Sequence, residues 1–334
     1  MTTLNKRAVL AIVLLCGVFV FGLGCRSIVP GQPNSNCRDG EQVKITMLDR
    51  TNAAAVPEFV ANYDAAHFLH KFEPTEGKFA PAAIAAPLVA AAVSGAVDYV
   101  AKAITNEAAL YQAQFGDTLA DDAFLIRGDG TTNYFQNYYG IKVERVAVSK
   151  HVRTNAFTLI CGIGHTADNQ LFVVKPLIFE TRLAKAKVVE AGFFPSLVNW
   201  IFSVKGGNYL NSTADFKFDG YFKGTDQTLK VIPMGAFSFK FQSYDIASPK
   251  PLTVLNGGIN PKQTSGFLDA APISYEPPEG KPLHTTHAGN FTLTVNVTES
   301  DASNVKEHLE KLGQLVYQQK GVVITTITNK IEGK

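Results

Sequence analysis

Phenylalanines that alternate with other residues constrain this chain most strongly. They fall at every second position in two nearby segments, with Phe216 and Phe218 in DFKFDGYFKG, then Phe237, Phe239 and Phe241 in AFSFKFQSYDI. Successive side chains of a β-strand point to opposite faces, so each segment would place its rings on one face. The chain has 23 Phe in 334 residues. We therefore expect a β-rich body with an aromatic core.

Further segments carry strand patterns. A short first strand is expected over residues 42–48, and turn-like stretches such as HTADNQ separate several of the others. The other apolar runs are IKVERVAV, FTLICGIG, LFVVKPLIFETRL and FTLTVNV. Short strands at this spacing are typical of an antiparallel sheet, sandwich or similar architecture. With the helices below, they predict an α+β fold with an antiparallel β-rich body.

The Ala-rich stretch over residues 81–115 predicts a long helix, because Ala is the best helix former. Residues 82–97 are apolar on all sides. Small residues on such a helix suit either membrane insertion and oligomerisation or burial inside the fold. Pro87 near one end and Asp98 near the other make it short for a membrane span. We expect a buried central helix, preceded by another helix over residues 56–72.

The C-terminal part reads as a strand–helix–strand unit. FTLTVNV is the first strand, residues 301–319 the helix, and GVVITTITNKI the second strand. Ser300 or Asp301 could cap the start of the helix. Gly321 suits its end.

The first 25 residues read as a membrane-targeting leader. Lys6 and Arg7 form a positive flank, and residues 8–24 contain no charge. A positive flank followed by an apolar core directs the following chain across a membrane. The segment is also just long enough to span a bilayer as a helix.

The end of this leader resembles the lipobox of bacterial lipoproteins. Small residues precede a cysteine in Gly22, Leu23, Gly24 and Cys25, although Gly22 stands where that class usually has Leu. The resemblance covers four residues. It implies a lipid attached to Cys25 and a protein exported to the cell envelope, anchored on the periplasmic or outer face. An uncleaved anchor helix and ordinary signal cleavage remain the alternatives.

The chain divides into six expected regions. Roughly 300 residues follow the leader, enough for one large domain or two ordinary ones. The regions are the leader or anchor (1–25), a flexible tether (26–41), a mainly helical region (42–139), a β-rich region (140–248), a Pro-rich connection (249–289) and the strand–helix–strand unit (290–334).

Charge and cysteines limit the partners. A net charge of +2 gives no electrostatic case for nucleic-acid binding. We expect contact with a lipid bilayer through the N-terminus, a protein partner in the envelope, and no cofactor. Cys37 and Cys161 could form a disulfide in an exported compartment. A buried free thiol at Cys161 is the simpler interpretation.

Motifs for catalysis are weak. His67 and His70 could share one helix face and bind a metal, with Asp64 or Glu73 nearby, yet the His-Glu-x-x-His pattern is absent. We find no nucleophile elbow, phosphate-binding loop or dinucleotide fingerprint.

Two further motifs have simple interpretations. The tripeptide Arg127, Gly128 and Asp129 matches the integrin-binding sequence but reads as a tight turn. Aspartates around it lack the EF-hand spacing of a calcium site; they are Asp117, Asp121, Asp122 and Asp129.

The sequence thus leaves three hypotheses. The favoured one is a non-enzymatic, membrane-tethered envelope protein that acts as a binding, assembly or scaffold subunit. The second is an envelope hydrolase with a metal or composite site around His67 and His70. The third is a membrane-active protein that uses residues 82–97.

Overall fold

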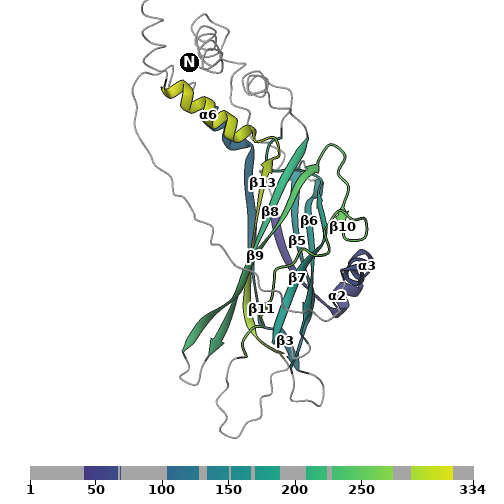
Figure 1. The fold of residues 1–334 in the computed structure, drawn as a ribbon. Coiled ribbons are helices and arrows are strands. Elements are labelled where there is room, and N and C mark those ends of the chain that lie inside the picture. Colours follow the sequence, from purple (N-terminus) through teal and green to yellow (C-terminus); the bar gives the residue numbers. More distant parts are fainter. Residues whose placement is uncertain are drawn as a thin grey trace, which may run out of the picture.

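Two antiparallel sheets face each other in this computed structural model and form an elongated sandwich (Figure 1). The structure describes residues 41–66, 68, 104–127, 134–149, 152–166, 170–188, 208–223, 228–273 and 287–318. Within these ranges the chain is mostly antiparallel β-sheet with a few helices. The expected β-rich body is therefore confirmed, whereas residues 82–97 and the last strand of the C-terminal unit lie outside the described ranges.

The first sheet has the strand order β1-β5-β6-β7-β10, with β11 also paired to β7. Every pairing in it is antiparallel. Its strands are β1 (Gln42–Asp49), β5 (Tyr138–Ser149), β6 (Val152–His165), β7 (Leu171–Thr181), β10 (Leu252–Thr253) and β11 (Leu268–Asp269).

The second sheet has the order β2-β13-β8-β9, and its β2 runs close to β1 of the first sheet. Its strands are β2 (Gln112–Asp121), β13 (Asn290–Asp301), β8 (Tyr209–Lys223) and β9 (Leu229–Asp245). A small third sheet joins β12 (His287–Ala288), β3 (Leu125–Arg127) and β4 (Tyr134–Gln136).

Alternation along the strands builds the core between the two main sheets. In β13 the apolar residues Phe291, Leu293, Val295 and Val297 are buried, and the residues between them are polar and less buried. Rings from the two sheets meet directly. The pairs, with centroid distances, are Phe115–Phe157 (5.1 Å), Phe172–Phe218 (5.3 Å) and Phe179–Phe241 (4.0 Å). These contacts hold the sheets together by apolar burial and ring packing.

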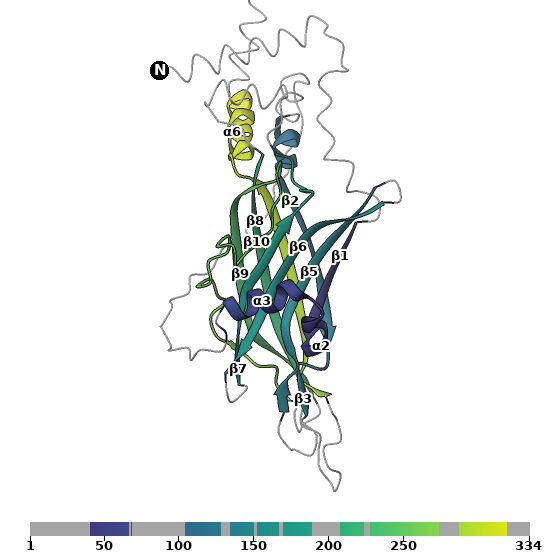
Figure 2. The ribbon, with the colours of Figure 1, turned by 90° about the vertical axis from the view of Figure 1, so that its right-hand side faces the viewer.

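Two helices cover the outer face of the first sheet (Figure 2). They are α2 (Arg50–Ala54) and α3 (Pro57–Ala65). Glycines on the sheet allow close contact, because a Cβ at Gly164 would lie 2.4 Å from Phe68 and one at Gly140 would lie 2.6 Å from Phe59. Lys175 of β7 donates to the Ala66 carbonyl over 2.8 Å, which neutralises the C-terminal end of α3.

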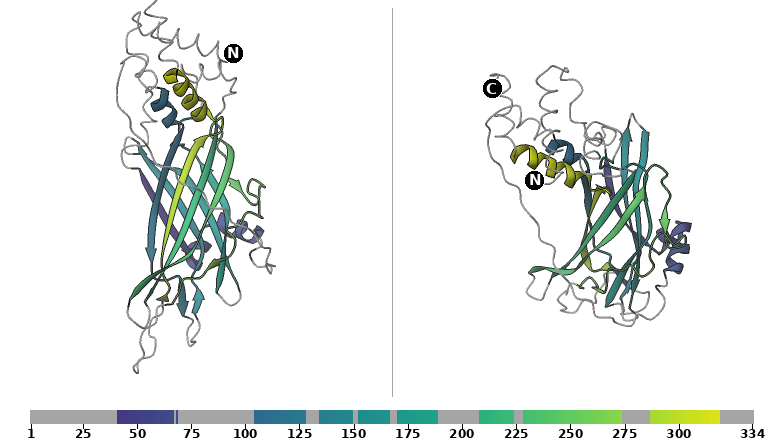
Figure 3. Two further views of the ribbon diagram at one scale, coloured as in Figure 1. Left: turned by 60° about the vertical axis from the view of Figure 1, so that its left-hand side comes forward. Right: turned by 45° about the horizontal axis from the view of Figure 1, so that its top comes forward.

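A third helix lies at one end of the sandwich. Helix α6 (Val305–Gln318) and the helical residues 104–110 sit together over this end, which we call the helix end (Figure 3). The β8–β9 hairpin projects from the opposite end, which we call the hairpin end. From Asn211 to Lys223, β8 covers about 40 Å at the usual rise of about 3.3 Å per residue.

The irregular segment after β9 covers the open edge of β7. Besides β10 and β11, the Ser265 amide donates to the Val174 carbonyl, and the Ala270 amide donates to the Gln170 carbonyl. A covered edge cannot pair with another strand. In the described part of the expected Pro-rich connection, residues 249–273, the only strands are the two-residue β10 and β11.

Three sequence-based boundaries need correction. The Ala-rich helix was expected to continue to Phe115, but β2 begins at Gln112. The region 42–139 was expected to be mainly helical, but its described residues include more strand than helix, in β1 to β4 and the start of β5. Helix α6 begins at Val305, four residues later than expected. Asp301 instead ends β13, where its carboxylate accepts the Ser303 amide over 2.8 Å.

Candidate functional site

The helix end contains a buried ion pair between the two sheets. Arg145 of β5 and Glu299 of β13 both have fully buried side chains, and Nη2 of Arg145 lies 3.6 Å from Oε1 of Glu299. Both occupy core-facing positions. Arg145 is two residues after the buried Val143, and Glu299 is two residues after the buried Val297, so each points to the same face as its buried neighbour. Alternation therefore forces these charges inward.

Neighbouring groups complete this cluster. Glu41, just before β1, has carboxylate oxygens 3.5 Å from Nη1 of Arg145 and 3.2 Å from Nζ of Lys185. The Lys185 and Ala186 backbone amides donate to Oε2 of Glu299 over 2.5 and 3.2 Å. The Arg145 guanidinium also lies over the Phe115 ring at 4.7 Å. The cluster thus ties residues 41 and 185–186 to both sheets.

Burial governs the charge state of Glu299. Loss of water raises the pKa of its carboxyl, although Arg145 and the two amide donors oppose that rise. The side chains of Arg145 and Glu299 are closed to solvent, so this ion pair is part of the core packing. We assign it a structural role.

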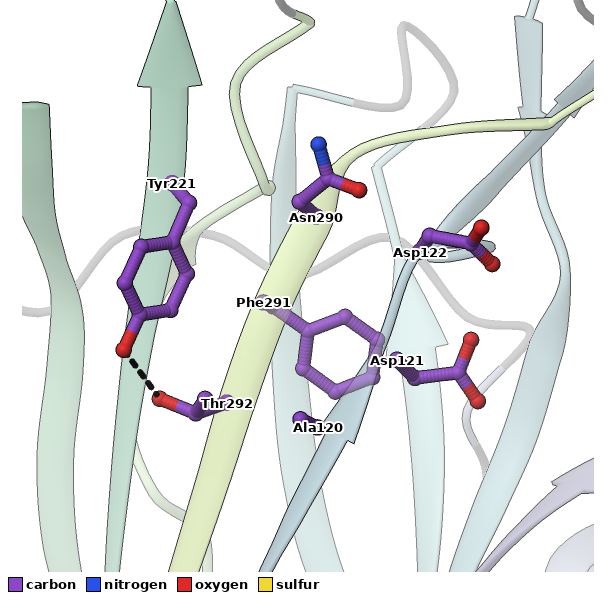
Figure 4. Close-up of a pocket in the computed structure, with 7 residues that line it drawn as sticks. All are labelled: Ala120, Asp121, Asp122, Tyr221, Asn290, Phe291 and Thr292. Carbon is purple, nitrogen blue, oxygen red and sulfur yellow. Dashed lines mark hydrogen bonds between the residues drawn. The ribbon is translucent and has the colours of Figure 1, made fainter. Parts of the chain in front are cut away.

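The hairpin end presents an open depression of about 600 Å³ on the second sheet (Figure 4). It lies where β2 ends, β13 begins and β8 approaches its tip. Its lining residues are Ala120, Asp121, Asp122, Tyr221, Asn290, Phe291 and Thr292.

Strand pairing explains how these residues come together. Tyr221 pairs with Asn290 of β13, and its hydroxyl lies 3.4 Å from the Thr292 hydroxyl. On its other side Tyr221 pairs with Val231 of β9, and paired residues point to the same face. Val231 and, two residues away, Leu229 therefore extend the face of Tyr221 outward from the depression.

The end of β9 is unusually apolar for a surface. Leu229, Val231 and Ile232 are 66%, 56% and 38% exposed. All residues of β9 from Leu229 to Pro233 are exposed, whereas Gly220 of the paired strand β8 is buried and Tyr221 is half-buried. The strand re-enters the sandwich at the buried Met234 and at Gly235, whose φ is +146°.

Asp121 and Asp122 give the opposite side of the depression a negative charge. The Asp121 carboxylate accepts from the Tyr138 hydroxyl over 2.8 Å and from the Ala123 amide over 3.0 Å, which fixes its position. Burial, followed by this hydrogen bond, raises the pKa of Tyr138, so Tyr138 stays a donor. In Figure 4 both carboxylates extend to the side of β13 away from Tyr221. The depression thus combines an aromatic and apolar side with an acidic side.

Most residues singled out in the sequence fall outside this depression. Cys25, Cys37, His67 and His70 lie outside the described residues, as do Glu73, Gly128 and Asp129. Asp64 is exposed on α3, and Arg127 ends β3. Asp117 is exposed on β2, whereas Asp121 and Asp122 do line the depression.

Cys161 is a buried free thiol in β6. Burial raises its pKa, which makes the thiolate scarce and the group unreactive. His165 is four residues further along the same strand, at a distance of about 13 Å by strand geometry. A Cys–His catalytic pair therefore does not form here.

Sequence reasoning missed the buried cluster and the apolar hairpin. The available signal for the cluster was a charged residue at a position where the two-residue periodicity of a strand predicts an apolar one. Arg145, which follows Ile141 and Val143, is such a residue. For the hairpin the signal was the apolar Leu229, Val231 and Ile232, which lie between the two segments of alternating phenylalanines. The depression itself joins strands that are far apart in the sequence, so no local pattern could reveal it.

Comparisons with known proteins add no relative, since no family model, curated protein or solved structure matches this chain. Among the described side chains, no three of His, Cys, Asp or Glu come together as a metal site would require. In the same part of the chain, no helix combines the length and apolar character needed to cross a bilayer.

Proposed function

We propose that this chain is a non-enzymatic, membrane-tethered protein of the cell envelope that acts as a binding or scaffold subunit. One observation carries the proposal. Glu41, where the expected tether ends, lies in the buried cluster at the helix end, whereas the exposed apolar ribbon lies at the opposite end. A body attached at one end presents its other end to partners.

The lipobox-like leader supports the membrane side of this proposal. Cys25 would carry the lipid and hold the protein on the periplasmic or outer face of a membrane. Residues 26–41, rich in Pro, Gly, Asn and Ser, would act as a flexible tether.

The packing of the body supports a binding role. The space between the sheets is filled by rings such as Phe172, Phe179 and Phe218, each essentially inaccessible to solvent. The depression is instead open to solvent at the junction of β2, β13 and β8. Open surfaces of this kind suit contact with another protein.

The test is the membrane attachment of a Cys25→Ala variant. We expect this variant to accumulate as an uncleaved precursor or to leave the membrane fraction, while Cys16→Ala, within the same leader, behaves as the parent. Intact-mass measurement of the parent should show acyl groups on a chain that begins at Cys25. A mature chain that begins elsewhere and carries no acyl group would refute the lipoprotein anchor.

A further inference from the structure

We infer that the hairpin end is a docking surface for a protein segment that carries a basic side chain next to apolar ones. This inference rests on the proposed role as a binding subunit and adds the chemistry of the partner. The surface consists of the depression together with Leu229 and Val231, and we call it the docking surface.

The apolar side needs a cover that the described chain does not provide. A two-stranded ribbon has little stability by itself in water, and five successive β9 residues from Leu229 are exposed here. Polar residues would suit such a position, yet Leu229, Val231 and Ile232 occupy it. Contact with apolar side chains of a partner would bury them at about 25 cal/mol per Å².

The acidic side gives the partner its charge. Asp121 and Asp122 form no ion pair with another side chain that the structure describes. Lys217, on the same sheet, is paired with Asp219 at 2.6 Å. A lysine or arginine of the partner would therefore balance the charge of the two aspartates.

The positions of the apolar side and the acidic side of the docking surface determine the order of apolar and basic residues along the partner segment. Asn290 and Thr292 of β13 separate Tyr221 from the aspartates (Figure 4). A segment that crosses β13 would thus place apolar residues over Tyr221 and Val231 and a basic residue beside Asp122. The amide of Asn290 and the hydroxyls of Tyr221 and Thr292 would form the polar rim of this contact.

A lipid surface fits less well. Membrane surfaces of the envelope carry anionic headgroups, and these would be repelled by Asp121 and Asp122. The docking surface also lies at the hairpin end, whereas Glu41, where the expected tether ends, contacts Arg145 at the helix end.

Two short peptides test the inference on the full chain in phosphatidylcholine nanodiscs. The probe is acetyl-Val-Val-Gly-Lys-Lys-amide, with its apolar residues at one end and its lysines at the other, and acetyl-Val-Val-Gly-Glu-Glu-amide is its matched control. We expect the lysine peptide to bind more tightly than the glutamate peptide, and its binding to weaken as salt rises above about 0.1 M. Asp122→Asn and Val231→Ser should each weaken it about five-fold.

Controls separate this result from misfolding and from general charge effects. Glu307→Gln removes an exposed charge from α6 at the other end and should leave binding unchanged. The urea midpoints of Asp122→Asn and Val231→Ser should equal that of the parent, because these residues are exposed.

Three outcomes would overturn the inference. They are equal affinity for the two peptides, no binding of either, or binding that both variants leave unchanged. Quenching of Val231→Trp by brominated lipid, beyond that of the parent with its one Trp, would identify a bilayer contact and also overturn it. The peptide test and the lipidation test have independent outcomes. The peptide can bind even if Cys25 carries no lipid, and it can fail to bind even if Cys25 is lipidated.

Discussion

The two ends of the sandwich differ in what they bury: the helix end buries charged side chains, whereas the hairpin end exposes apolar ones. At the helix end Arg145 and Glu299 are fully buried and paired within the core. At the hairpin end Leu229 and Val231 are exposed, and Asp122 is open to solvent. Buried, paired charges fix one arrangement of a structure, whereas exposed apolar groups beside charges are suited to a partner. The comparison separates residues that stabilise the fold from residues that would bind.

The largest effect should come from Glu299→Leu. This change removes the buried carboxylate beside the Arg145 guanidinium and the acceptor of the Lys185 and Ala186 amides. Arg does not lose its charge, so we expect a loss of about 3–5 kcal/mol in the free energy of unfolding, measured by urea titration.

A double variant makes this test sharper. Arg145→Leu together with Glu299→Leu removes both charges and should recover much of the loss. The matched surface change, Lys217→Ala, breaks an exposed ion pair and should cost about 1 kcal/mol or less. Equal losses for Glu299→Leu and Lys217→Ala would contradict the assigned structural role of the cluster.

An intermediate effect is expected at Gly235, where β9 leaves the sandwich for the exposed ribbon. A Cβ there would lie 2.4 Å from Cδ2 of Leu268, and φ is +146°. We expect Gly235→Ala to cost about 1–3 kcal/mol from crowding and backbone strain. Gly257→Ala is the control, because φ is +72° but no atom lies within 4 Å, so strain alone should cost about 1 kcal/mol. Identical urea midpoints for Gly235→Ala and the parent would show that the ribbon is not fixed at this point.

The smallest effect is the pH dependence of Glu299. Its folded pKa is raised, so its contribution to stability is greatest below the unfolded value of about 4.3 and is lost as pH rises through the folded pKa. The groups that face it are Arg145, Glu41 and the Lys185 and Ala186 amides. Glu299→Gln does not titrate, so the stability of the parent relative to this variant should fall from about pH 4 to pH 7. A difference that rises over this interval would show that the ion pair outweighs burial.

Sequence periodicity predicted the strands with one fully buried face. The phenylalanines of β8 and β9, and the alternation in β13, gave clear signals because every second residue enters the core. The first four residues of β2, up to Phe115, were predicted to be helical, because the Ala-rich pattern upstream continues into them and only Phe115 of this strand is buried. Asp301 was taken for a helix cap because polar residues at core-facing positions of a strand are rare.

The site was less predictable than the fold. A depression that joins β2, β8 and β13 depends on tertiary pairing over more than 150 residues of sequence, as Asp121 pairs with Phe291. His67 and His70, which the sequence offered only as weak candidates for a metal site, lie outside the described residues. Asp121 and Asp122 were noticed as an acidic cluster, but their neighbours were not.

Hydrogen exchange of the full chain, followed by mass spectrometry, tests the contrast between the two ends most directly. We expect amides of residues 229–232 to exchange far faster than those of residues 295–299 near the buried cluster, because the ribbon opens without unfolding the core. Addition of the lysine peptide should slow exchange in residues 229–232 and leave residues 295–299 unchanged. Equally slow exchange at both ends without peptide would contradict the account, since it would mean that the hairpin end is already covered or packed.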